Sequence, residues 1–69
     1  MERPDIIKEL EKVMLEKNIS LESASRLIEC SKSTVSRWLA GKSRPSKIYA
    51  EVLKRAIQRM RKLKGGNQD

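Results

Sequence analysis

The residues best suited to chemistry lie on one face of a short helical pattern over residues 32–40. Positions three and four apart lie together on a helix, so the polar residues of this segment share one side. They are Lys32, Ser33, Ser36 and Arg37. Val35, Trp38 and Leu39 fall on the other side and are expected to face the core. The outward face is short-chained and cationic, so it can donate hydrogen bonds to an acceptor-rich or anionic partner.

The sequence offers little that would support catalysis or metal binding. It contains no histidine, and its one cysteine, Cys30, has no nearby base or second thiol. Glu9 and Glu16 have lysines at helical spacing and are interpreted as a solvated helix face. Gly41-Lys42-Ser43 lacks the upstream glycine of a phosphate-binding loop. We therefore expect no enzyme activity, no metal site and no cofactor.

Charge divides the 69-residue chain into two unlike parts. Residues 1–30 contain five Lys or Arg and seven Asp or Glu, a net charge of −2. Residues 31–69 contain eleven Lys or Arg and two Asp or Glu, a net charge of +9. A basic region that begins at the polar face favours a polyanionic partner, although a solubilising surface is the alternative.

The apolar pattern predicts a compact, all-α domain over residues 1–64. The helices are expected at about 4–17, 21–28, 32–40 and 47–63, with a flexible C-terminal tail at 65–69. Ser20, Ser31 and Ser46 stand where a hydroxyl can cap the next helix, and Gly41 can end the third helix in the left-handed conformation. Only Glu29 and Cys30 separate the second and third helices, so these two must cross steeply.

Two segments carry a resemblance to a known family. Cys-Ser-Lys-Ser-Thr-Val-Ser-Arg-Trp, residues 30–38, is similar to its turn and recognition helix, and Ala-Gly-Lys-Ser-Arg-Pro-Ser, residues 40–46, to its phosphate-contacting loop. The family is the helix-turn-helix DNA-binding domain of the phage repressor and Cro type, also described as xenobiotic-response-element-like. The resemblance covers roughly residues 15–53 and implies a four-helix domain that binds double-stranded DNA.

Two departures from the family pattern bear on the structure. Glu29 stands where the family usually has glycine at the turn, and a non-glycine residue at positive φ costs about 1 kcal/mol. The turn is therefore expected to be either slightly strained or differently built. The chain also has no counterpart of the fifth helix that many members carry, so something else is expected to complete the core or the dimer.

The resemblance assigns DNA contacts to particular residues. The base-reading candidates are Lys32, Ser33, Ser36 and Arg37. The phosphate-contacting candidates are Ser20, Ser31, Thr34, Lys42, Ser43, Arg44 and Lys47. Lys32 has phosphate contact alone as its alternative role. The competing role of Ser20 and Ser31 is purely structural capping.

Trp38 is interpreted as a core anchor rather than a stacking platform, because it follows Val35 by three residues on the inward side. The chain has no Phe, and only Tyr49 joins Trp38 as an aromatic residue. Recognition of single strands or RNA usually needs more aromatic surface than this. Double-stranded DNA is therefore favoured as the partner.

The last helix is longer than a small core requires and carries a heptad-like apolar seam. Its members, the candidates for a homodimer contact, are Tyr49, Leu53, Ala56, Met60 and Leu63. Val52 and Ile57 would then face the domain's own core. The alternative is that the helix packs only on its own domain, and the cations around the seam would repel one another across a close parallel pair.

The sequence thus predicts a sequence-specific transcriptional regulator, a repressor, that acts in the cytoplasm on nucleoid DNA. Its prokaryotic or phage origin is implied by the family resemblance alone. One alternative is an antitoxin or accessory module whose last helix binds a heterologous protein partner. The other is membrane-surface binding by residues 46–64. That alternative is the weaker one, because the segment has no interfacial Trp, and no apolar run approaches the roughly 20 residues needed to span a bilayer.

Overall fold

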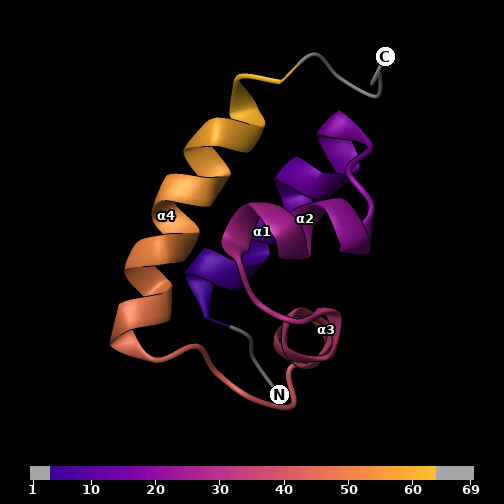
Figure 1. Cartoon of the computed structure of the whole chain (residues 1–69). Helices are drawn as coiled ribbons and strands as arrows, with labels where there is room; N and C mark the ends of the chain where they lie inside the picture. The colour runs from indigo at the N-terminus through magenta and orange to yellow at the C-terminus, as the bar shows by residue number, and fades with distance from the viewer. Residues whose placement is uncertain (1–3, 64–69) are drawn as a thin grey trace.

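A computed structural model describes residues 4–63 of the chain. It consists of α1 (Asp5–Lys17), α2 (Leu21–Ile28), α3 (Lys32–Ala40) and α4 (Lys47–Arg61). The predicted all-α, four-helix architecture is confirmed (Figure 1). The last helix ends at Arg61, two residues before the expected end at residue 63, and Lys62 is its C-terminal cap. The expected tail at 65–69 lies outside the described residues.

Serine hydroxyls begin three of the helices. Ser20 Oγ accepts a hydrogen bond from the amide of Ser23 at 3.1 Å, and Ser31 Oγ from that of Thr34 at 3.2 Å. Ser46 Oγ accepts from the amide of Tyr49 at 3.4 Å. Each bond satisfies one amide that has no partner within its own helix. The caps therefore fix where α2, α3 and α4 start, at the positions that the sequence predicts.

Three helices end in the same way, with one residue in the left-handed conformation. These residues are Asn18 (φ 56°), Glu29 (φ 67°) and Gly41 (φ 78°). After α2, the amide of Cys30 donates to the carbonyl of Ser25 at 3.0 Å, and the amide of Glu29 to that of Arg26 at 3.2 Å. This pair of bonds is a Schellman motif. The turn is therefore built in the usual way around a residue that has a Cβ, which resolves the expectation in favour of slight strain.

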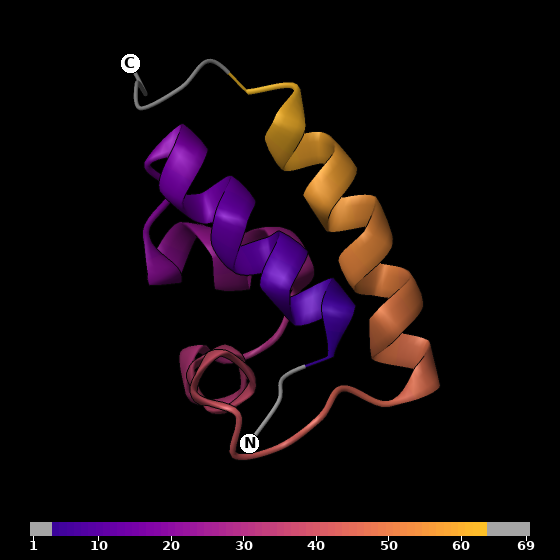
Figure 2. The same ribbon diagram turned by 180° about the vertical axis from the view of Figure 1, so that it is seen from behind.

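The core lies mainly between α1 and α4, which make the most extensive helix contact (Figures 1 and 2). Its fully or almost fully buried side chains are Ile7, Leu10, Val13, Ala24, Ile28, Val35, Trp38, Leu53, Ala56, Ile57 and Met60. Ile7 is completely buried, whereas its neighbour Ile6 is only partly buried against the core. Four helices thus share one continuous apolar cluster.

The α2 and α3 helices cross steeply, as their short connection requires. Figure 1 shows α3 nearly end-on while α2 lies across the view. Small residues on α2, Ala24 and Ser25, are buried on the side that packs inward. Trp38 of α3 is 3% exposed, and its ring meets Tyr49 of α4 edge-on at a centroid separation of 5.4 Å. Trp38 therefore anchors α3 in the core.

Most of the heptad-like seam packs inside the chain's own core. Leu53, Ala56 and Met60 are at most 2% exposed within a single chain, because they pack in its own core. Of the five seam residues, only Tyr49 and Leu63 remain exposed, at 37% and 45%. Ile57 faces the core as expected. The dimer contact itself stays a prediction, and the three buried residues offer almost no surface to it.

Candidate nucleic-acid interface

The outward face of α3 is open to solvent along its whole length. Each of its base-reading candidates, Lys32, Ser33, Ser36 and Arg37, is exposed. They line a shallow hollow together with Leu21, the first residue of α2. Leu21 is not among the contact candidates that the sequence predicts. The structure leaves it half-buried, where it forms the apolar wall of the hollow.

Helix geometry separates the two cations of this face. Lys32 and Arg37 are five positions apart, which at the α-helical rise is about 7.5 Å along the axis of α3. Successive base pairs of a duplex are about 3.4 Å apart, so two side chains at this spacing could not both lie over the same base pair if α3 ran along the duplex. The serines between them are short and leave room for a base edge to approach. The face is therefore shaped to enter a groove that offers hydrogen-bond acceptors.

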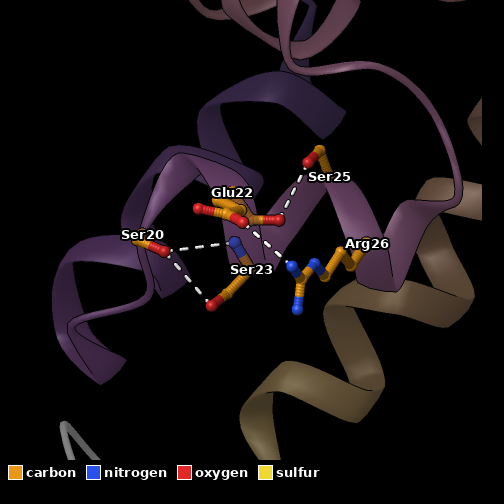
Figure 3. Close-up of polar contacts among 5 residues, drawn as sticks. All are labelled: Ser20, Glu22, Ser23, Ser25 and Arg26. Atoms are coloured by element: carbon orange, nitrogen blue, oxygen red, sulfur yellow. Dashed lines mark hydrogen bonds and ion pairs between the residues drawn. The ribbon is translucent and has the colours of Figure 1, made fainter.

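The start of α2 holds a small hydrogen-bond network, drawn in Figure 3. Ser20 Oγ accepts from the amide of Ser23 and donates its own hydrogen to Ser23 Oγ at 3.1 Å. The one hydrogen of the Ser20 hydroxyl is thus used inside the protein, which favours its capping role over donation to a phosphate. Ser23 Oγ still has its hydrogen available and is exposed. The sequence did not single out Ser23 as a hydroxyl donor on this surface. Its position three residues after the Ser20 cap was the available signal.

Two further contacts in Figure 3 hold α2 together. Arg26 and Glu22 form an ion pair at 2.9 Å with both side chains largely exposed, the pair that their spacing predicts. The buried hydroxyl of Ser25 donates to the carbonyl of Glu22 at 2.8 Å. Arg26 is therefore partly neutralised, and the cations of α3 and the following loop dominate the charge of this surface.

The start of α3 uses a similar pair of hydroxyls. Ser31 Oγ accepts from the amide of Thr34 at 3.2 Å and lies 2.9 Å from Thr34 Oγ1. One hydrogen bond between the hydroxyls consumes one of their two hydrogens, so one is left for an outside acceptor. Ser31 is exposed and Thr34 half-exposed. Capping and contact with a phosphate are therefore compatible for this pair.

The loop after α3 is attached to the helix that it follows. The amide of Lys42 donates to the carbonyl of Arg37 at 2.9 Å, as part of the motif that ends α3 at Gly41. Lys42, Ser43 and Arg44 are all exposed, as is Lys47 at the start of α4. This bond fixes the backbone of Lys42 at the C-terminal end of α3, so the loop cations begin beside the outward face of that helix.

The described residues hold no grouping suited to other chemistry. Burial raises the pKa of the Cys30 thiol, which disfavours the thiolate that a nucleophile or metal ligand needs. Within residues 4–63, no three His, Cys, Asp or Glu side chains gather closely enough to hold a metal ion. No helix in that part of the chain is long and apolar enough to cross a membrane.

Comparison with known proteins agrees with this geometry. The sequence profile of the helix-turn-helix family matches residues 10–59, a stretch that runs from α1 to near the end of α4. Searches of curated proteins and of solved structures returned no significant match. Membership in this family implies DNA binding. The chain belongs to the helix-turn-helix family of the phage repressor and Cro type.

Proposed function

We propose that this protein is a sequence-specific regulator of transcription, a repressor, that reads the major groove of double-stranded DNA with α3. The observation that carries the proposal is the outward face of α3. It is polar, cationic and exposed, while Val35 and Trp38 on the other side hold the helix in the core. In this family a helix so placed lies in the major groove, with its first residues on base edges.

The side chains divide into base readers and backbone contacts. Arg37 can donate two parallel hydrogen bonds to guanine O6 and N7, and Lys32 can donate to the same atoms. Ser33 and Ser36 are short enough to meet a base edge directly. Such contacts discriminate between bases by about 1 to 3 kcal/mol for each good bidentate pair.

Contacts to the phosphates would hold α3 in register at both of its ends. Ser23, Ser31 and Thr34 offer hydroxyls near its first turn, whereas the loop after its last turn offers cations. The loop candidates are Lys42, Ser43 and Arg44, followed by Lys47. Phosphate contacts fix orientation without reading sequence. The Ser20 hydroxyl, whose hydrogen is used within the chain, is assigned to capping alone.

The proposal includes a homodimer on two half-sites. Helix-turn-helix dimers bind half-sites about 34 Å apart, one turn of the duplex, which makes the operator a palindrome or a repeat. A repressor of this kind would act in the prokaryotic cytoplasm by occupying DNA that the transcription machinery must enter. Most of the heptad-like seam is buried within the chain, so only Tyr49 and Leu63 of it remain available to a second copy.

Selection from a random duplex library at about 0.15 M salt tests the proposal, because non-specific attraction is strongly screened there. We expect enrichment of a palindromic or directly repeated motif, with its half-site spacing reporting the dimer. Salt-sensitive binding without any enriched motif would contradict sequence-specific readout. A reporter gene placed behind the enriched site then separates repression from activation.

The second candidate function is that of an accessory or antitoxin module that binds another protein. A specific observation favours it, namely a second hollow between α2 and α4 whose lining includes Arg55 and Arg59. Co-purification of a stoichiometric protein partner, with DNA binding only in the complex, would favour this role over that of an independent regulator.

A further inference from the structure

The hollow between α2 and α4 is separate from the outward face of α3. It is lined by Leu27 and Glu29 on the α2 side and by Val52, Arg55, Ala56 and Arg59 on the α4 side. It shares no residue with the hollow beside α3. Its floor is apolar, because Ala56 is buried and Leu27 and Val52 are packed partly against the core. The floor can therefore receive an apolar side chain from outside.

The rim of this hollow carries two arginines that have no ion-pair partner in the described part of the chain. Arg55 and Arg59 lie one helical turn apart on α4, and neither forms an ion pair within residues 4–63. The neighbouring cations differ, since Lys54 pairs with Glu51 and Arg61 with Glu9 of α1, each at 3.8 Å. Glu29 is the one carboxylate among the lining residues. The rim is thus net positive.

The surrounding part of α4 adds to the positive charge of the rim. Residues 52–63 contain five Lys or Arg and no Asp or Glu. In a twofold dimer built on this hollow, both copies would present the same patch, so the arginines of one α4 would approach those of the other. The single Glu29 of each copy could not neutralise two arginines. Charge complementarity therefore favours a partner that is acidic rather than a second copy.

We propose that this hollow docks an acidic amphipathic helix of a partner protein. An apolar side chain of that helix would enter between Leu27 and Val52, and carboxylates one turn apart would accept hydrogen bonds from Arg55 and Arg59. An amphipathic helix presents both features at one spacing, because its residues at i and i+4 lie on the same face. Arginine suits the rim, since its planar fork donates two parallel bonds to a carboxylate.

Docking at this hollow would leave α3 open. Leu27 and Leu21 are six positions apart on α2, which places them about 120° apart around the helix axis. A helix bound over Leu27 therefore does not cover Leu21 or the outward face of α3. The inference does not rest on the proposed DNA-binding function, and the partner and a duplex could occupy one molecule together.

A titration of the whole chain, labelled with nitrogen-15, with a designed peptide tests the inference. The probe is a synthetic helical peptide with Leu at i, i+4 and i+7 and Glu at the flanking positions. We expect amide shifts at Leu27, Val52 and Ala56 and none across residues 32–40. Replacing the central Leu of the peptide by Ser should weaken binding about tenfold, because the apolar anchor is lost.

Two protein variants with the same change in charge provide the matched control. Arg59→Glu should weaken the peptide about tenfold, whereas Lys54→Glu, which lies off the hollow, should change affinity by less than about twofold. Equal weakening by both variants would overturn the inference in favour of general electrostatic attraction. Shifts at the hollow that grow with protein concentration alone would identify a second copy as the occupant and overturn it as well.

A titration with a duplex of random sequence tests whether the hollow binds DNA rather than an acidic helix. If the duplex shifts Val52 and Ala56 while the acidic peptide does not, the hollow belongs to a nucleic-acid interface and the inference fails. The selection experiment measures DNA sequence preference, whereas the peptide titration measures binding at the hollow. A failure of the proposed DNA readout would therefore leave the peptide result unaffected.

Discussion

The α1–α4 pair and the α2–α3 pair are held in place by different forces. α1 and α4 have 13 and 15 residues, make the most extensive contact and provide most of the buried aliphatic side chains. α2 and α3 have only 8 and 9 residues, and each is bounded by a serine cap and a Schellman motif. Helices shorter than about 12 residues are marginal by themselves in water.

The difference teaches how so small a domain can present a rigid polar face. Apolar burial, which favours folding, is concentrated between α1 and α4. Local hydrogen bonds at the ends of α2 and α3 set where those short helices begin, end and turn. Few buried residues connect the two pairs, and Trp38 is the largest of them. Substitutions in the two pairs should therefore have effects of different kinds.

The largest effect is expected where the two pairs meet. Trp38→Ala should lower the free energy of unfolding by about 3 to 5 kcal/mol, because it removes a buried aromatic side chain and its contact with Tyr49. A domain of this size has little more stability than that, so much of the protein should be unfolded. Urea unfolding followed by circular dichroism measures the loss. A native-like Trp38→Ala protein would show that α3 does not depend on this anchor.

The next effect tests whether the apolar seam of α4 serves the core or a dimer. Leu53→Ala should lower the free energy of unfolding by about 2 to 5 kcal/mol, since Leu53 is 0% exposed. Leu63→Ala, at an exposed position of the same seam, should change it by about 0.5 kcal/mol or less. Thermal unfolding compares the two variants, and sedimentation measures their mass. A Leu53→Ala protein that keeps its stability but loses a dimer would restore the seam as an interface.

A third pair of substitutions separates base readout from backbone contact without disturbing the core. Arg37→Ala should weaken binding to the selected site by about 1 to 3 kcal/mol and leave binding to random duplex little changed. Lys42→Ala should weaken both about equally and reduce the salt slope by about one. Fluorescence anisotropy at several salt concentrations gives these values. If both variants behave alike, the assignment of Arg37 as a base reader is wrong.

The smallest effect concerns the turn within the α2–α3 pair and has the opposite sign. Glu29→Gly should raise the free energy of unfolding by about 0.5 to 1 kcal/mol, because glycine adopts the left-handed conformation without a Cβ clash. Asn18→Gly, in the same motif after α1, is the control. Asn18→Gly should raise the free energy of unfolding by less, since asparagine already tolerates this conformation. Urea unfolding measures both changes. Equal increases in the free energy of unfolding would mean that the turn at Glu29 is no more strained than the turn at Asn18.

Much of the fold followed from local patterns that act within one helix. Serine caps, Gly41 and the short break at Glu29 each act over three or four residues, so they can be recognised without knowing the neighbours. The outward face of α3 was equally accessible, because helical periodicity separates Ser33 from Val35. The roles of Leu21 and Ser23 were missed, since each depends on what lies beside α2 and on how a neighbouring hydroxyl is used.

The sequence by itself determined which residues form helices, which face of α3 is polar and which family the motif resembles. Only the tertiary structure decided what covers each apolar face. A heptad-like spacing shows that Leu53 and Met60 must be buried, but the burial of apolar surface is non-directional and does not depend on which chain supplies the cover. The same limit applies to Glu29, which lies far in the sequence from Arg55 and Arg59. Packing of α2 against α4 gathers them at one hollow.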